Sequence, residues 1–204
     1  MKQRIVIFGG TFDPVHYGHV TPILHACDNI NATQLIYLPC HIPPHKQSPS
    51  VTSEHRLNIV KLLTAELNQQ VTFDVTYSDV ELRQQGHSFT RLSIEYFAQQ
   101  HPQAELFFLI GMDSLLSFTS WHKWQEILQF CQLLVVKRPG HIYMANQLPK
   151  ELIDKVIFAD VAELEISSTN IRHASELSEV EKQLPKVVAE YIKQHKLYDF
   201  LCTR

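Results

Sequence analysis

The chain has 204 residues, of which 45% are apolar and 19% charged, and its formal net charge is −3 at pH 7. This composition is typical of soluble globular proteins and excludes the disordered, low-complexity and fibrous classes. The slightly negative charge excludes a global basic field that would gather nucleic acid or an anionic membrane, so any anion site must be local.

Targeting and redox signals point to a cytoplasmic protein. The N-terminal sequence MKQRIVIFGG lacks the extended apolar region and cleavage site of a signal peptide. No apolar stretch reaches the roughly 20 residues that a bilayer-spanning helix needs. The four cysteines are far apart and form no CxxC pair, so we expect them to be reduced and mostly structural.

Short β-rich apolar runs alternate with longer segments of helical period, which favours parallel strands joined by crossover helices. We expect strands at residues 4–8, 34–39, 71–75, 105–110, 133–136 and 156–159. We expect helices at residues 16–28, 53–68, 90–100, 121–130 and 185–196. Residues 39–53 and 139–150 are predicted loops. The first could act as a lid.

The pattern predicts one domain over residues 1–204 with an α/β fold. Its core would be a doubly wound, Rossmann-like and mostly parallel sheet with helices on both faces. In such sheets ligands bind beyond the carboxyl ends of the strands, so candidate functional residues are sought where strands end.

The first predicted strand ends in Gly9 and Gly10, which allow the backbone to approach a ligand closely. A helix start follows with His16, Gly18 and His19, and helix starts offer free N–H groups and a positive dipole end to anions. The two histidines lie on one face and can donate to phosphate oxygens. A tight turn with surface histidines is the alternative. The absence of GxGxxG and of a P-loop argues against an oxidoreductase and a P-loop kinase.

A second segment, ISSTNIR, occupies residues 166–172. Ser167 or Ser168 can cap a helix there, while exposed N–H groups and Arg172 meet phosphate oxygens. A plain capped helix with a surface arginine is the alternative interpretation.

GGTFDPVHYGH and ISSTNIR resemble the two signatures of the HxGH nucleotidyltransferase superfamily, whose members activate nucleotides or small phosphates with ATP or CTP. Between them the chain carries, in order, PCHIPPHK, Arg56, HSFTRL, FLIGMDSL, SWHKW and KRPG. This ordered set resembles bacterial nicotinate-mononucleotide adenylyltransferases along nearly the whole chain. The likeness to phosphopantetheine adenylyltransferases is only partial.

The resemblance implies transfer of AMP from ATP to nicotinate mononucleotide, giving deamido-NAD and pyrophosphate in NAD biosynthesis. It implies Mg²⁺, held mainly by ATP phosphates and water, no metal ligand set of the protein's own, and no covalent enzyme intermediate. The catalytic residues it implies are His16, His19, Lys46 and Arg172. The ATP-binding residues it implies are Gly9, Gly10, Thr11, Phe12, His16, Gly18, His19, Gly111, Asp113, Ile166, Ser167, Ser168, Thr169 and Arg172.

The resemblance implies that the acceptor is bound by Lys46, Thr90, Trp121, His122 and Arg138. Thr90 and backbone N–H groups near Trp121 and His122 would receive the nicotinate carboxylate, and the Trp121 ring would stack on the pyridine ring. Core packing is the alternative role for Trp121.

Asp113 could hydrogen-bond a ribose hydroxyl or cap a helix, and both roles remain open. Phe89 and His122 depart from the family pattern, in which Tyr is frequent at the first position and Tyr or Lys at the second. Both departures leave the selectivity between acid and amide acceptors open.

Other functions are weighed against this one. An adenylyltransferase for nicotinamide mononucleotide or 4′-phosphopantetheine remains an alternative, as does a non-catalytic nucleotide sensor. A fragment of a class I aminoacyl-tRNA synthetase is disfavoured because KMSKS and a basic field are absent. Cys40, His41 and His45 do not provide the four ligands of a structural zinc site. The expected partners are ATP and nicotinate mononucleotide, without nucleic acid or membrane, and a homo-oligomer is left open.

Overall fold

The computed structural model describes residues 2–41, 48–84, 88–137, 148–161, 164–198 and 200. It contains strands β1 (Arg4–Gly10), β2 (Gln34–Pro39), β3 (Asp74–Tyr77), β4 (Glu105–Gly111), β5 (Gln132–Lys137) and β6 (Val156–Asp160). The strands form a six-stranded sheet in the order β3-β2-β1-β4-β5-β6. This order reverses beside β1, as in doubly wound α/β folds, and it confirms the predicted fold class.

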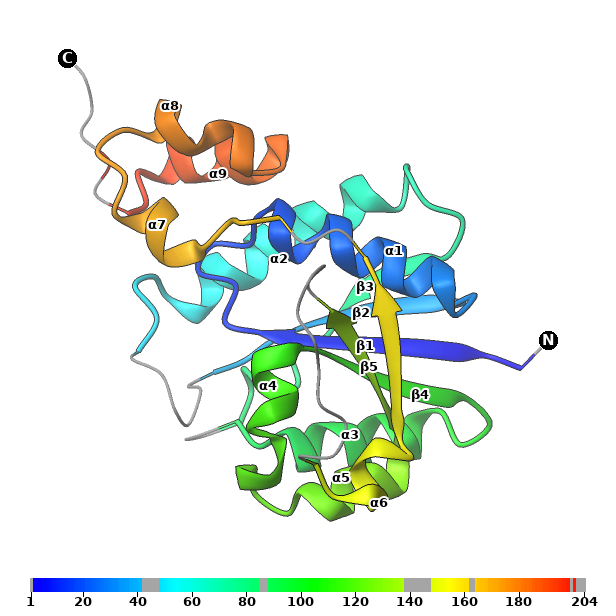
Figure 1. Ribbon diagram of the computed structural model, residues 1–204. Helices are drawn as coiled ribbons and strands as arrows, with labels where there is room; N and C mark the ends of the chain where they lie inside the picture. The colour runs from blue at the N-terminus through cyan, green and yellow to red at the C-terminus, as the bar shows by residue number, and fades with distance from the viewer. Residues whose placement is uncertain are drawn as a thin grey trace. The chain divides into compact units, whose positions relative to one another are not determined.

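Helices connect the strands (Figure 1). They are α1 (Thr21–Asn29), α2 (Ser53–Leu67), α3 (Thr90–Gln100), α4 (Met112–Leu116), α5 (Trp124–Phe130), α6 (Lys150–Ile153), α7 (Ser168–Arg172), α8 (Leu177–Val180) and α9 (Lys186–His195). Short 3₁₀ turns are η1 (Tyr17–His19), η2 (Phe118–Ser120) and η4 (Glu181–Gln183). Within the described ranges, each helix is too short or too polar to cross a membrane.

The chain divides into two compact units. Unit 1 consists of Met1–Gly9, Pro22–Ile36 and Phe89–Glu163, and unit 2 consists of Gly10–Thr21, Tyr37–Ser88 and Leu164–Arg204. Each unit draws on distant parts of the sequence, because the chain leaves and re-enters it. The single domain over residues 1–204 stays a prediction.

Parallel strand pairs form the core of unit 1. Residues from Arg4 to Phe8 pair with those from Glu105 to Leu109, and β4 pairs in turn with β5 and β5 with β6. The β4 side chains from Leu106 to Ile110 are all buried. Figure 1 shows α1 on one face of these strands and α3, α5 and α6 on the other. Covering both faces explains why the strands are almost continuously apolar.

In unit 2, α2 packs against β3 and α9. The buried stripe of α2 includes Ile59, Val60 and Leu63, which recur at helical spacing. A polar contact also joins the two helices, because the Tyr191 hydroxyl of α9 lies 3.0 Å from Nδ1 of His55. Thr52 begins α2 by accepting the His55 amide proton at 3.4 Å.

Three predicted elements differ from the observed ones for local reasons. The helix expected at 16–28 starts at Thr21 instead, since Pro22 has no N–H and fits only the first turn of a helix. The strand expected at 71–75 starts at Asp74, because the Val71 amide is bonded to Leu67 O of α2. The helix expected at 121–130 starts at Trp124, after Lys123 with its left-handed φ of 53°.

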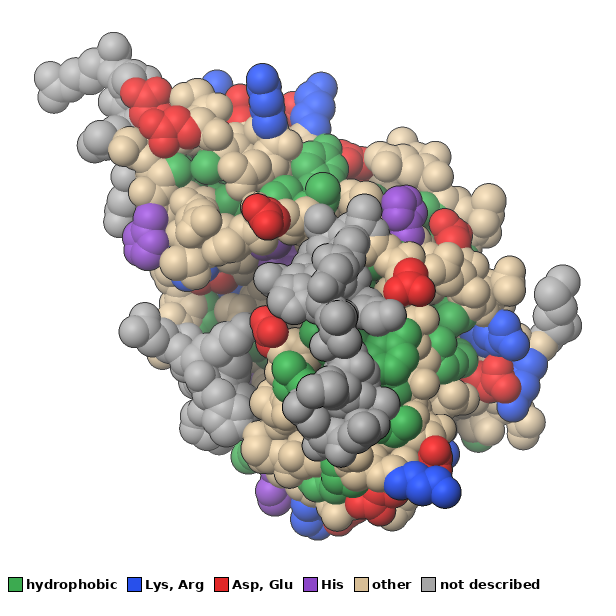
Figure 2. Space-filling model, viewed as in Figure 1, with side chains coloured by type: hydrophobic (Ala, Val, Ile, Leu, Met, Phe, Trp, Pro, Cys, Tyr) green, Lys and Arg blue, Asp and Glu red, His purple; other side chains and the backbone are tan. Residues whose placement is uncertain are grey.

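Charged side chains of both signs are interspersed on the face seen in Figure 2, outside the grey residues. Glu105 pairs with Arg4 at 3.0 Å and with Lys2 at 3.2 Å, and Arg91 pairs with Glu126 at 2.8 Å. Hydrogen bonding to Arg4 and Lys2 lowers the pKa of the Glu105 carboxyl. These basic groups are therefore partly neutralised by acidic neighbours.

Candidate active site

The loop that follows β1, GGTFDP at residues 9–14, has a fixed and strained backbone. Phe12 adopts a left-handed φ of 51°, which is unfavourable for a residue with a side chain, yet its ring is buried. A Cβ on Gly10 would lie only 2.7 Å from Cε1 of Phe12. Gly10 is therefore required because the Phe12 ring folds back over it.

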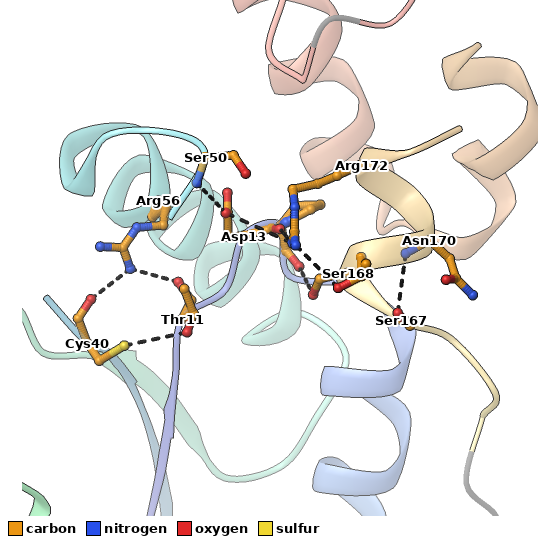
Figure 3. A network of polar contacts seen from close by, with 11 residues as sticks. Thr11, Asp13, Cys40, Ser50, Arg56, Ser167, Ser168, Asn170 and Arg172 are labelled. Atoms are coloured by element: carbon orange, nitrogen blue, oxygen red, sulfur yellow. Dashed lines mark hydrogen bonds and ion pairs between the residues drawn. The ribbon is translucent and has the colours of Figure 1, made fainter. Parts of the chain in front are cut away.

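Arg56 of α2 holds one side of this loop (Figure 3). Its Nη1 donates to Thr11 O and to Cys40 O, both at 2.7 Å, and its Nη2 donates to His41 O at 3.3 Å. The side chain is only 1% exposed. Burial lowers the pKa of the Arg56 guanidinium, while Cys40 and Asp13 act in the opposite direction. Because arginine's ordinary pKa is so high, Arg56 remains a buried cation.

The second signature holds the same loop from α7 (Figure 3). Arg172 donates from Nη1 to Asp13 O at 2.6 Å, and the Ser168 hydroxyl donates to Pro14 O at 3.0 Å. Ser167 accepts the Asn170 amide proton at 3.2 Å and caps α7, which confirms the predicted serine cap. The two signatures thus lie together in unit 2, although Ser168 and Pro14 are 154 positions apart.

Asp13 lies between these supports and is itself buried. Its Oδ2 accepts the Ser50 amide proton at 2.7 Å and lies 4.0 Å from Nη1 of Arg172. Its Oδ1 is buried without a hydrogen-bond partner among the described residues. Asp13 therefore places a buried carboxyl group in a loop that two guanidinium groups contact.

The rings of His16 and His19 are stacked with centroids 3.8 Å apart. His16 is 3% exposed, and burial lowers its pKa from 6.5 to about 4. Its imidazole is therefore neutral at pH 7. A Cβ on Gly18 would lie 2.9 Å from two atoms of the His16 ring, so a side chain here would force that ring to shift.

His19 is held by aromatic neighbours in unit 2. Its ring packs edge-on against the Phe12 ring at 5.7 Å, and its carbonyl accepts the Tyr37 hydroxyl proton at 3.0 Å. The predicted pair of histidines on one face is confirmed, but it lies in the 3₁₀ turn η1 rather than in an α-helix. Both rings can offer an N–H donor to an anion.

In unit 1, Trp121 follows the turn η2 and is half-buried. Its ring packs on Phe118 at 5.1 Å and on Phe108 at 6.1 Å, and its amide donates to Phe118 O at 3.0 Å. The ring therefore has an aromatic support on one side and remains partly exposed. A partly exposed ring with an aromatic support can stack on a ligand, whereas a fully buried ring cannot.

The two departures from the family pattern lie against each other. The rings of Phe89 and His122 are 5.1 Å apart, and Phe89 immediately precedes Thr90, the first residue of α3. His122 is exposed. One half-buried apolar ring and one exposed imidazole thus lie together beside the start of α3.

Gly111 ends β4 and is the N-cap residue of α4, so the interpretation of Asp113 as the cap is wrong. Asp113 is exposed in the first turn of α4, and its role toward a ribose stays a prediction. A Cβ on Gly111 would meet nothing within 4 Å. Of the other predicted residues, Ile166 is half-buried, and Thr169 is exposed and accepts a proton from Arg172 at 3.3 Å.

Lys46 and Arg138 lie outside the described residues, so their predicted roles are not addressed by the structure. Gly9 is in β1, one residue before unit 2 begins. Among the described residues, no group of three or more His, Cys, Asp or Glu side chains could hold a metal ion.

Sequence reasoning gave no role to Arg56 or Asp13. A signal for Arg56 exists, because it occupies the apolar stripe of α2 that continues through Ile59, Val60 and Leu63. A charged residue at a core position usually has a specific partner. Asp13 had no comparable signal apart from its place in GGTFDP, because its burial depends on α7 and Ser50, which are distant in sequence.

The chain is similar in sequence to proteins of a known family. The cytidylyltransferase-like family model matches residues 7–174. A probable nicotinate-nucleotide adenylyltransferase of a Shewanella species is 34% identical over 219 aligned residues, covering 96% of this chain and 99% of the relative. The corresponding Aeromonas salmonicida protein is 35% identical, covering 97% and 98%.

The fold also matches a solved structure. Plasmodium falciparum nicotinic acid mononucleotide adenylyltransferase, complexed with NaAD, superimposes with a TM-score of 0.77 at 22% identity and covers 97% of this chain and 98% of its own. At this identity the likeness shows the fold alone.

Proposed function

The chain belongs to the cytidylyltransferase-like family, and we propose that it transfers AMP from ATP to nicotinate mononucleotide. The products are deamido-NAD and pyrophosphate, and the reaction is a step in NAD biosynthesis. The proposal is supported by full-length relatives that are named probable nicotinate-nucleotide adenylyltransferases. The structural observation that carries it is the contact of Arg172 and Ser168 with the GGTFDP loop.

The cluster on the GGTFDP loop binds the ATP phosphates. Arg172 has five N–H donors and uses only part of them on Asp13 O and Thr169, so further donors serve phosphate oxygens. His16 donates as a neutral imidazole toward the α-phosphate, and His19 donates toward the leaving pyrophosphate. The remaining ATP contacts are proposed at Gly9, Gly10, Thr11, Phe12, Gly18, Gly111, Asp113, Ile166, Ser167, Ser168 and Thr169.

The acceptor is bound by residues of unit 1 and by Lys46. The exposed part of the Trp121 ring stacks on the pyridine ring, whose cationic character favours an aromatic face. Because the Trp121 amide donates within its own turn, the carboxylate is received by Thr90 and by N–H groups beyond Trp121. Lys46, His122 and Arg138 complete the proposed acceptor contacts.

Catalysis consists of positioning and charge stabilisation. The acceptor phosphate attacks the α-phosphorus of ATP in line, the bond to the β-phosphate oxygen breaks, and pyrophosphate leaves with that electron pair. Such a displacement needs no enzyme nucleophile, and holding both reactants in place supplies much of the rate enhancement. Fixed cationic and N–H donors stabilise the charge that develops on the leaving group.

Mg²⁺ is the proposed cofactor. The ion would be coordinated mainly by ATP phosphates and water, because Mg²⁺ gives up its water ligands reluctantly. When bound, the ion neutralises phosphate charge. We expect a chelator to abolish turnover and added Mg²⁺ to restore it.

The direct test is to mix the protein with ATP, Mg²⁺ and nicotinate mononucleotide. We expect pyrophosphate and deamido-NAD to form in equal amounts. ATP binding without either product would support a nucleotide sensor and contradict the proposed enzyme. Omission of the acceptor is the control, and it should prevent pyrophosphate release.

A further inference from the structure

We propose that Arg56 is a positioning residue for the transfer of AMP. It fixes the GGTFDP loop against the segment that follows β2, and this alignment sets the geometry in which ATP phosphates bind. The inference rests on the proposed function, and it assigns to that function a residue that donates to three backbone carbonyls.

Arg56 lies where the backbone pairing between the GGTFDP loop and the segment that follows β2 ends. Cys40 N donates to Gly10 O at 2.9 Å. The next carbonyl of the first segment, Thr11 O, and the carbonyl of Cys40 both accept from the same nitrogen, Nη1 of Arg56, at 2.7 Å. The guanidinium thus continues the connection one residue beyond the last direct backbone bond, where the two segments separate.

The peptide between Cys40 and His41 is fixed from both sides. Its carbonyl faces Arg56, and in a trans peptide the N–H points the opposite way. That N–H, on His41, donates to the buried Ser88 hydroxyl at 2.9 Å. The orientation of this peptide therefore depends on two side chains, Arg56 and Ser88, and both are distant from it in sequence.

On the GGTFDP loop, three carbonyls accept hydrogen bonds from two different helices. Thr11 O is bonded to Arg56 of α2, whereas Asp13 O and Pro14 O are bonded to Arg172 and Ser168 of α7. Figure 3 shows the two arginines reaching the loop from these two helices. Loss of Arg56 would weaken the attachment of the Thr11 end of the loop, where the Cys40 thiol contact with the Thr11 hydroxyl at 3.7 Å remains, and leave the other end held.

Burial of Arg56 is poorly explained by stability alone. A buried charge has a large desolvation cost, and replacing such a group with an apolar side chain of similar size is often neutral for stability. Arg56 is 1% exposed and its Nε has no hydrogen-bond partner among the described residues. A guanidinium is nevertheless the side chain that can reach three carbonyls of two segments at once. Positioning accounts for its presence.

The experiment compares Arg56→Lys and Arg56→Met with the matched variants Arg4→Lys and Arg4→Met. Arg4 is a suitable control because its Nη1 makes the same kind of bond, to Ile30 O at 2.7 Å, within unit 1. For each protein, kcat, the KM of each substrate and the thermal midpoint are measured. A lysine keeps the charge but lacks the planar fork, so it cannot hold all three carbonyls.

We expect Arg56→Lys to lower kcat/KM for ATP by ~10-fold or more, because small misplacements of bound reactants have large effects on rate. The KM of Arg56→Lys for nicotinate mononucleotide should stay within about twofold of wild type. The kcat/KM of the Arg4 variants should also stay within about twofold. Millimolar guanidinium, far below the molar concentrations that unfold proteins, should partly restore an Arg56→Ala variant.

A second variant keeps the test decisive if the Arg56 variants do not fold. Ser88→Ala removes the opposite support of the Cys40–His41 peptide, and we expect it to lower kcat/KM for ATP by about threefold to tenfold. The inference is overturned if a folded Arg56→Lys protein retains wild-type kcat/KM for ATP, or if Ser88→Ala does so when no Arg56 variant folds. Absence of turnover in the wild type would instead contradict the proposed function.

Discussion

The two stacked histidines of η1 differ in their surroundings, and each supports a separate prediction. His19 is half-buried and packs edge-on against Phe12. We expect His19→Ala to lower kcat by at least ~10²-fold, because a fixed donor to the developing charge is lost. The measurement is steady-state turnover, with the exposed His25→Ala of α1 as the control. Near-normal turnover of the His19 variant would refute its role in phosphate stabilisation.

His16 predicts a pH dependence of stability. Burial lowers its pKa from 6.5 to about 4, so between these values the unfolded chain binds a proton that the folded chain does not. The free energy of unfolding should therefore be fully retained above pH 6.5 and fall as the pH drops toward 4, by about 3 kcal/mol at most. Denaturant unfolding at several pH values measures this fall. His16→Asn should flatten it, and an unchanged slope in the variant would contradict the assignment.

Trp121 predicts an effect confined to the acceptor. Trp121→Ala should raise the KM for nicotinate mononucleotide by ~10-fold or more through loss of stacking on a cationic ring, and leave the KM for ATP near its wild-type value. Trp124→Ala is the matched control, because Trp124 also packs on Phe118, at 6.3 Å. A rise in the KM for ATP alone would reverse the assignment of this ring.

At the scale of elements, the turn η1 depends on a glycine. A Cβ on Gly18 would press on the His16 ring at 2.9 Å, whereas one on Gly111 would meet nothing within 4 Å. We expect Gly18→Ala to lower the free energy of unfolding by roughly 1–3 kcal/mol, as overpacking does. Gly111→Ala, at the N-cap of α4, should change it by less than about 1 kcal/mol. Denaturant unfolding of both variants is the test, and equal stabilities would show that the ring moves aside freely.

The elements themselves were largely predictable. Long apolar runs placed β1, β2, β4, β5 and β6 within two residues of their observed ends, because strands buried on both faces need continuous apolar sequence. β3 was misplaced because the Val71 amide bonds to Leu67 O, which extends the end of α2. The short helices α4, α6, α7 and α8 have too few residues for a helical period to be recognised.

At the scale of the whole molecule, the two signatures mark residues that the fold brings together from opposite parts of the chain. Sequence reasoning predicted that Ser168 and Arg172 lie near bound phosphate. It could not show that they bond to the carbonyls of Asp13 and Pro14, because carbonyl directions follow from backbone angles. For the same reason the bonds of Arg56 to Thr11 and Cys40 emerged only from the structure.

Selectivity among acceptors also belongs to this scale, because it combines several contacts. Phe89 and His122 form a ring pair at 5.1 Å beside the start of α3. Discrimination between carboxylate and carboxamide depends on donors around the ring substituent. We expect the start of α3 to favour a negatively charged carboxylate over a neutral amide, because the positive end of the helix dipole lies there.

The central claim is tested most directly by steady-state kinetics with three acceptors under saturating ATP and Mg²⁺. We expect kcat/KM for nicotinate mononucleotide to exceed that for nicotinamide mononucleotide and for 4′-phosphopantetheine, each by ~10-fold or more. Identification of the adenylated product in each reaction excludes plain ATP hydrolysis. A higher kcat/KM with nicotinamide mononucleotide or 4′-phosphopantetheine would contradict the proposed substrate.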